Sequence, residues 1–156
     1  MKIYLINVGK TNIRYLNEGI LIYEKRIKRY VPFEIYDIPE LKKTKGLSIN
    51  NLKDSEGKSI IKYIEKSDYS ILLDKKGKEF DSPEFSGYIQ RLMNRSLSTV
   101  YFFTGGVNGF SKDVYSKADE LISLSKMTFP HQMIRLIFAE QLFRALTILK
   151  GEPYHH

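Results

Sequence analysis

The chain has 156 residues and a mass of 18.2 kDa, a size at which one domain buries about 70% of its unfolded surface, so residues 1–156 are predicted to form a single domain. It has no cysteine, which excludes disulfides and thiolate catalysis, and no apolar run near the roughly 20 residues of a membrane span, so we expect a cytoplasmic protein without a membrane partner. The formal charge of +7 and the isoelectric point near 9.4 favour a polyanionic partner such as nucleic acid.

Strands and helices are predicted to alternate along the chain. Apolar, β-forming runs predict strands at 2–8, 33–38, 69–74, 98–103 and 121–125. Apolar residues at i, i+3, i+4 spacing predict helices at 13–30, 51–65, 83–94, 112–118 and 132–149. Asp81 and Ser111 are expected to cap two of these helices. The alternation predicts an α/β protein with a parallel sheet of about five strands and helices on both faces.

The segment TGGVNG at 104–109 follows the fourth predicted strand, at the edge where parallel α/β sheets bind ligands. Its G-G-x-x-G spacing differs from the G-x-G-x-x-G of dinucleotide-binding folds. It also lacks the Gly-Lys-Ser/Thr of a phosphate-binding P-loop. The residues alone leave two interpretations open: a tight turn that needs positive φ, or a loop whose backbone approaches a ligand.

The last predicted helix is apolar around most of its circumference, which is typical of a helix buried in a core or against a second subunit. Its polar residues Glu140, Arg144 and Thr147 lie within about 60° of one another at 3.6 residues per turn. For Glu140 and Arg144, a plain i, i+4 ion pair and a functional or interface role both stay open. His131, in the first turn, is most simply interpreted as a capping or packed surface histidine.

Three basic clusters lie at 23–30, 41–45 and 73–78. Each one alone fits a solvated surface. Together, in a chain of this charge, they favour nucleic-acid binding, with Tyr23 and Tyr30 available for base stacking.

Five stretches, read in order, resemble one family along the whole chain. They are NVGK at 7–10, LLDKKGKEFDSPEF at 72–85, FTGGVNGF at 103–110, SLSKMTFPHQMIRLIFAEQLFRA at 123–145 and PYHH at 153–156. The set is similar to SPOUT-class methyltransferases of the type that methylates ring nitrogen 3 of a pseudouridine in large-subunit ribosomal RNA. The resemblance implies a SPOUT fold with a C-terminal trefoil knot, a homodimer, S-adenosylmethionine as cofactor without a metal, and the ribosome rather than DNA as partner.

The resemblance also implies the site residues. Carried onto matching positions, it gives as cofactor contacts Leu73, Gly105, Leu124, Ser125, Lys126, Met127, Thr128 and Phe129. It places Glu140 and Arg144 near the site, and Tyr154 and His155 in it. The pseudouridine ring nitrogen loses a proton on methylation, and His155 is the first candidate for accepting it, with Glu140 the second. His156 stands where the family usually has Lys or Arg, and two terminal histidines also fit a tag remnant.

Two other functions stay as alternatives. A non-catalytic RNA-binding α/β module would explain the charge but not the glycine loop together with MTFPH at 127–131. A nicotinamide-dependent oxidoreductase would need the glycine fingerprint after its first strand, which this chain lacks.

Overall fold

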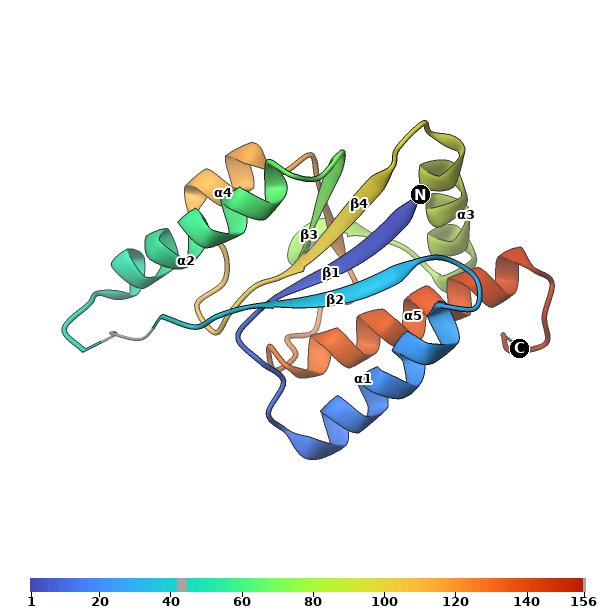
Figure 1. Cartoon of the computed structure of the whole chain (residues 1–156), viewed down its shortest axis with the longest axis horizontal. Coiled ribbons are helices and arrows are strands. Elements are labelled where there is room, and N and C mark those ends of the chain that lie inside the picture. Colours follow the sequence, from blue (N-terminus) through green and yellow to red (C-terminus); the bar gives the residue numbers. More distant parts are fainter. Residues whose placement is uncertain (42–44, 156) are drawn as a thin grey trace.

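Five strands and five helices alternate in the computed structural model, which describes residues 1–41 and 45–155 (Figure 1). In chain order they are β1 (Lys2–Val8), α1 (Arg14–Ile27), β2 (Phe33–Ile38), α2 (Ile49–Ile64), β3 (Tyr69–Glu79), α3 (Ser82–Asn94), β4 (Thr99–Thr104), α4 (Lys112–Lys117), β5 (Glu120–Ser123) and α5 (Met133–Leu149). The predicted alternation is therefore confirmed. Within the described residues, no helix is both long enough and apolar enough to cross a membrane. Lys42 and Lys43 of the predicted basic cluster, and His156, lie outside the described residues.

All strand pairs of the sheet are parallel, in the order β2-β1-β4-β3-β5. The register aligns Thr104 with both Asn7 and Leu73, so the carboxyl ends of the central strands meet at one edge. There the Thr104 hydroxyl donates to the Asn7 side-chain oxygen (2.8 Å), and the Asn7 amide donates to Asp37 (2.9 Å). These bonds fix the edge from which the loops of the site depart.

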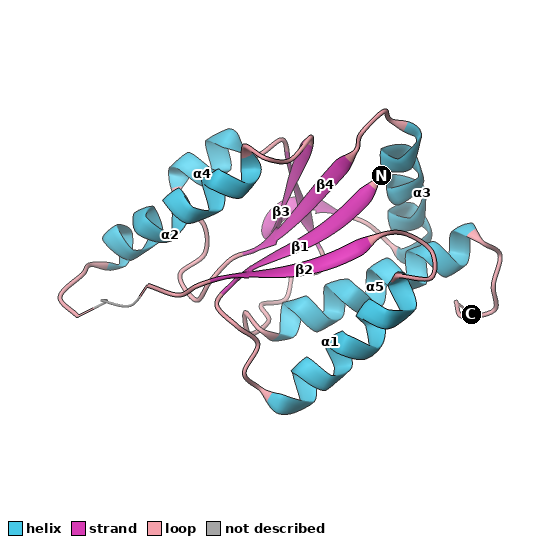
Figure 2. Ribbon diagram, viewed as in Figure 1, coloured by secondary structure: helices cyan, strands magenta, loops and turns pink. Residues whose placement is uncertain are grey.

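Helices cover both faces of the sheet, as predicted (Figure 2). Period-2 alternation along β1 sends Ile3 and Leu5 into the cluster shared with α1, α3 and α5, and Ile6 into the cluster shared with α2 and α4. The helix α5 packs between α1 and α3, with Phe138 and Leu142 fully buried. Much of its apolar circumference is thus buried within the chain, and the homodimer stays a prediction.

Strand β3 is longer than predicted and continues past Asp74 to Glu79. Leu73 and Lys78 both pair with Ile122 of β5, so the ladder is irregular between them. A Cβ on Gly77 would come within 2.4 Å of the Ile122 backbone nitrogen, so this glycine allows β5 to approach. β5 in turn ends at Ser123 rather than at residue 125.

Both predicted helix caps are confirmed. Asp81 accepts from the Glu84 backbone N–H (2.7 Å), and Glu84 accepts in return from the Asp81 backbone N–H, which forms a capping box on α3. Ser111 accepts from the Val114 backbone N–H at the start of α4. The trefoil knot implied by the family resemblance stays a prediction.

Candidate functional site

A cavity of about 500 Å³ lies at the carboxyl end of β4, beside the middle of β3. Its walls are residues 73–75 of β3, the glycine loop after β4 and the loop between β5 and α5. The predicted cofactor residues on its walls are Leu73, Gly105, Leu124, Ser125, Met127, Thr128 and Phe129. The structure does not bring Lys126 to this wall, because its side chain is 87% exposed and its ammonium lies 3.6 Å from the Glu79 carboxylate.

The glycine loop contains the tight turn that the sequence left open, while its approach to a ligand stays a prediction. Gly109 has a φ of +75°, and its N–H donates to the Gly106 carbonyl oxygen (3.1 Å), so it forms a turn that favours glycine. Gly105 is not among the residues with positive φ, and a Cβ there would make ordinary contacts of 3.4 Å to Gly109 and 3.6 Å to Phe110. The fold therefore does not require glycine at 105, whereas a ligand in the cavity would benefit from it.

The loop before α5 is held by its own serines. The Ser123 hydroxyl donates to the Ser125 carbonyl oxygen, and the Ser125 hydroxyl accepts from the Met127 backbone N–H, both at 2.9 Å. His131 makes no capping bond to α5 and instead lines the cavity. Burial and the neighbouring Arg135 charge lower the pKa of His131, so its imidazole is neutral at pH 7.

Arg135 is a residue of the site region that the sequence analysis missed. It is completely buried, and its guanidinium donates to the Val8 carbonyl oxygen (2.6 Å) and the Thr11 hydroxyl (2.9 Å). Beside it, the Gln132 side-chain oxygen accepts from the Asn12 backbone N–H (3.0 Å). These bonds tie the start of α5, next to the cavity, to the end of β1. The only sequence signal is an arginine within an apolar helix.

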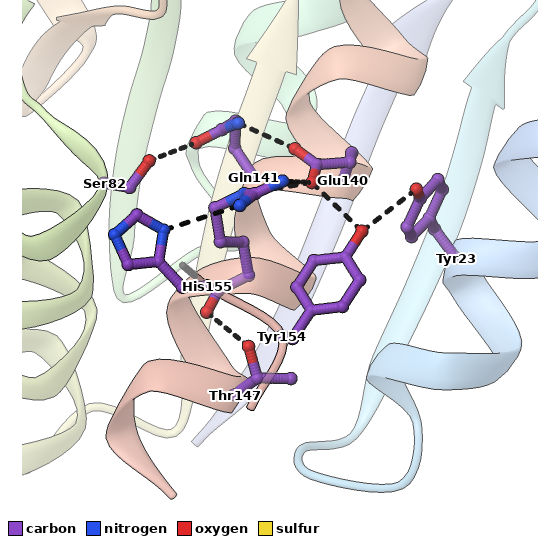
Figure 3. A network of polar contacts seen from close by, with 8 residues as sticks. Tyr23, Ser82, Glu140, Gln141, Thr147, Tyr154 and His155 are labelled. Atoms are coloured by element: carbon purple, nitrogen blue, oxygen red, sulfur yellow. Dashed lines mark hydrogen bonds and ion pairs between the residues drawn. The ribbon is translucent and has the colours of Figure 1, made fainter. Parts of the chain in front are cut away.

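The predicted catalytic residues form a second cluster at the other end of α5 (Figure 3). One oxygen of Glu140, Oε1, accepts from Arg144 Nε (3.1 Å), from Arg144 Nη2 (2.7 Å) and from the Tyr154 hydroxyl (3.2 Å). Arg144 Nη1 also lies 3.4 Å from Nδ1 of His155. Thr147 does not join this group, because it is buried and donates to the Arg144 carbonyl oxygen (2.7 Å).

Helix α1 and the turn that follows it support this tail cluster. The Tyr23 hydroxyl lies 3.3 Å from that of Tyr154, and the Tyr30 hydroxyl donates to the Glu152 carboxylate. Both Tyr23 and Tyr30 have their ring centroids 5.9 Å from that of Phe143. The two tyrosines predicted to be available for base stacking instead pack against α5 and bind the tail.

The cavity and the tail cluster do not meet within one chain. Ile134 lines the cavity, and Glu140, the residue of the tail cluster nearest to it along α5, lies six residues further, which is about 9 Å of helix. Figure 1 shows the loop that enters α5 and the C-terminal tail at opposite ends of this helix. The predicted cofactor and catalytic residues are therefore two separate groups in the isolated chain.

Comparison with known proteins places the chain in a family. A family profile described as "Predicted SPOUT methyltransferase" matches residues 1–155. The chain belongs to the SPOUT methyltransferase family. Similar relatives of this SPOUT methyltransferase include proteins named ribosomal RNA large subunit methyltransferase H from Christiangramia forsetii and Cytophaga hutchinsonii. Each is 53% identical over 156 residues, covering 100% of this chain and 99% and 100% of theirs.

A solved structure supports the fold of this SPOUT methyltransferase. It is described as a probable methylase family protein from Haemophilus influenzae Rd KW20, and it matches with a TM-score of 0.51 at 11% identity. The match covers 96% of the present chain and spans 66% of the other chain. At this identity the likeness concerns the fold alone.

The tail cluster of the SPOUT methyltransferase keeps the Tyr154 hydroxyl protonated. Burial, the Tyr23 hydrogen bond and the Glu140 charge all raise the pKa of Tyr154. A protonated phenol donates a hydrogen bond to Glu140 and does not serve as a base at neutral pH. Tyr154 is thus suited to hydrogen-bond donation.

Proposed function

We propose that this SPOUT methyltransferase acts in the cytoplasm and transfers a methyl group from S-adenosylmethionine to ring nitrogen 3 of a pseudouridine in large-subunit ribosomal RNA, on the assembled ribosome. The full-length relatives named ribosomal RNA large subunit methyltransferase H support the substrate class. The observation that carries the chemistry is the cavity built from Gly105 and the loop before α5. The charge of +7 suits a polyanionic substrate.

The cavity fits an adenosyl cofactor in size and lining. Its volume of about 500 Å³ lies within the roughly 300–1,000 Å³ of small-molecule sites. Leu73, Gly105 and the loop 124–129, apart from Lys126, would hold the cofactor, with the bare backbone at Gly105 leaving it room. When bound, S-adenosylmethionine supplies an electrophilic methyl group on a sulfonium, so the chain needs mainly to align the reactants and exclude water.

The tail supplies groups for the acceptor nucleotide. Because the imide nitrogen loses a proton on methylation, a nearby proton acceptor accelerates the reaction. Arginine only donates, so in the Arg144 contact the lone pair of His155 lies on Nδ1. We propose that this nitrogen accepts the imide proton of the substrate. The substrate N–H would take the place of Arg144, whose contact with Nδ1 is long, at 3.4 Å. Glu140 is the second choice, since both its carboxylate oxygens already accept hydrogen bonds.

The active form is proposed to be a homodimer in which the tail of one chain completes the cavity of the other. Within one chain, Glu140 and Arg144 lie about 9 and 15 Å along α5 from Ile134 of the cavity, which favours a shared site. Leu21 and Ile22, two large apolar side chains on α1, are 53% and 52% exposed. Together with the half-buried Ile137 of α5, they offer apolar surface to a second copy.

Thermal unfolding and methyl transfer together test this function. S-adenosylmethionine or S-adenosylhomocysteine at about 100 times its Kd should add roughly 2.7 kcal/mol of stability, whereas NAD should add none. Methyl transfer to ribosomes that lack the modification, followed by mass spectrometry of the nucleosides, should identify N3-methylated pseudouridine. A shift with NAD alone would favour an oxidoreductase. RNA binding without adenosyl-ligand binding or methyl transfer would favour the non-catalytic RNA-binding module.

A further inference from the structure

An aromatic shelf lies where α1 meets the tail, formed by Tyr23, Phe143 and Tyr154. The ring centroids of Phe143 and Tyr154 are 4.8 Å apart in an edge-to-face arrangement, and those of Tyr23 and Phe143 are 5.9 Å apart. Figure 3 shows Tyr23 and Tyr154 directed toward each other from α1 and the tail. The shelf therefore joins α1 to residues proposed for the acceptor site.

Arg26 lies on this shelf. Its guanidinium carbon is 5.5 Å from the Tyr23 ring centroid and 5.6 Å from that of Phe143, while the residue as a whole is exposed. Cation–π contacts of this kind hold a guanidinium in place and leave its N–H donors free at the edge. The ring contacts thus preorganise Arg26 for a partner in solution.

The neighbouring charges leave Arg26 without competition from acidic groups. Segment 23–30 carries four basic side chains and one acidic side chain, Glu24, which pairs with Lys28 at 2.6 Å. On the opposite side of the shelf, Glu140 pairs with Arg144 at 2.7 Å. Across residues 1–41 and 45–155, no carboxylate lies within ion-pair distance of Arg26. The local field favours an anion.

We propose that Arg26 binds a phosphodiester group of the ribosomal RNA beside the nucleotide that meets Tyr154 and His155. A planar guanidinium matches two phosphate oxygens with two parallel N–H bonds, which a mobile lysine does not. Arg26 lies three residues, or about 4.5 Å of helix, from Tyr23, which contacts Tyr154 directly. The proposal rests on the proposed function, since it needs the tail to engage RNA.

The simpler account is that Arg26 only covers apolar surface with its stem. Arg26→Met distinguishes phosphate binding from simple coverage of apolar surface, because methionine keeps most of the apolar side chain packed on the aromatic rings and removes the charge. Arg26→Lys keeps the charge and loses the planar fork. Arg91 provides a matched control, because it is also exposed and its guanidinium carbon lies 5.9 Å from the Tyr88 ring, on α3.

The test measures binding to a fluorescent single-stranded RNA oligonucleotide across a salt series, and methyl transfer to unmodified ribosomes. Arg26→Met should lower the log-log salt slope by about 0.7, the value for one phosphate contact on a single strand. It should also raise the KM for ribosomes about tenfold with kcat nearly unchanged, as expected when uniform binding is lost. Arg26→Lys should keep the slope and raise KM by a smaller factor, and Arg91→Met should match the wild type.

A wild-type slope and KM in Arg26→Met would overturn the proposal, as would equal losses in Arg91→Met. A wild-type protein that transfers no methyl group to ribosomes would instead overturn the proposed function. Unfolding curves on each variant confirm that the fold is retained. The two failures are therefore distinguishable.

Discussion

A mixed-dimer experiment tests the proposal that the tail of one chain and the cavity of another form one site. One variant ends at Pro153 and so lacks Tyr154 and His155 but keeps the cavity. The other carries Gly105→Val, whose β-branched side chain enters the cavity while the tail stays intact. A Cβ at this position meets its nearest neighbour at 3.4 Å, so the backbone accepts a side chain here, and an unfolding curve checks that the larger valine leaves the fold intact. Neither homodimer should transfer methyl groups at a substantial rate.

The expected activity of the mixture follows from the separation of the two groups. Because Tyr154 contacts Glu140, about 9 Å along α5 from the cavity residue Ile134, and does not line its own cavity, the tail is expected to serve the partner's cavity. A mixed dimer then holds one intact site, made from the cavity of the truncated chain and the tail of the Gly105→Val chain. Random exchange of equal amounts makes about half of the dimers mixed, so the mixture should recover about a quarter of wild-type activity.

The assay follows labelled methyl transfer to unmodified ribosomes after the variants are unfolded together and refolded. Differently tagged chains confirm that mixed dimers form, and each variant treated alone is the control. If mixed dimers form but the mixture stays inactive, the tail serves its own chain and the shared-site reasoning is refuted. A monomer by sedimentation would refute it earlier.

Three further predictions concern single residues. Gly109→Ala should lower the free energy of unfolding in urea by about 1–2 kcal/mol because residue 109 has a positive φ, whereas Gly105→Ala should leave it unchanged. Equal losses would refute the conclusion that the fold needs glycine at 109 but not at 105. The pKa of His131 is lowered in the folded chain, so the unfolded chain binds the proton first as the pH falls below 6.5, and the free energy of unfolding should decrease toward pH 5. The decrease should be smaller in His131→Gln, and parallel curves of stability against pH for the two proteins would contradict this. His155→Ala should slow methyl transfer at least about 100-fold, with cofactor affinity unchanged in calorimetry; a normal rate would move the proton-accepting role to Glu140.

The alternation of strands and helices could be predicted from the sequence, because the apolar periodicity of each element depends only on residues near one another in the chain. The extension of β3 through KKGKE was not, since exposed lysines give no apolar alternation and the pairing depends on Gly77 admitting Ile122 of β5. The strand order was also not predicted, because it depends on how the connections cross the sheet.

Part of the candidate site could likewise be predicted from the sequence, and part could not. Cofactor residues carried from the family resemblance lie on one cavity, apart from Lys126, whose exposed side chain turns to Glu79. The buried state of Arg135 depends on the Val8 carbonyl oxygen, 127 residues away in sequence. The contact of Tyr23 with Tyr154 spans 131 residues. Periodicity within one element gives no information about such partners.

The cavity rim includes residues from the stretch of β3 where the pairing with β5 is irregular. Residues 74–77 lie between two positions that share Ile122 as partner, so their peptide groups have no counterpart in β5 at that point. Asp74 and Lys75 belong to this stretch and line the cavity. Peptide N–H and C=O groups are offered by every residue type except proline, which lacks the N–H, so a ligand that used them here would tolerate changes of side chain. The exposed Lys75 is therefore free to change its charge, whereas Asp74 is held by the Tyr115 hydroxyl (2.6 Å) and the Lys76 backbone N–H (2.9 Å).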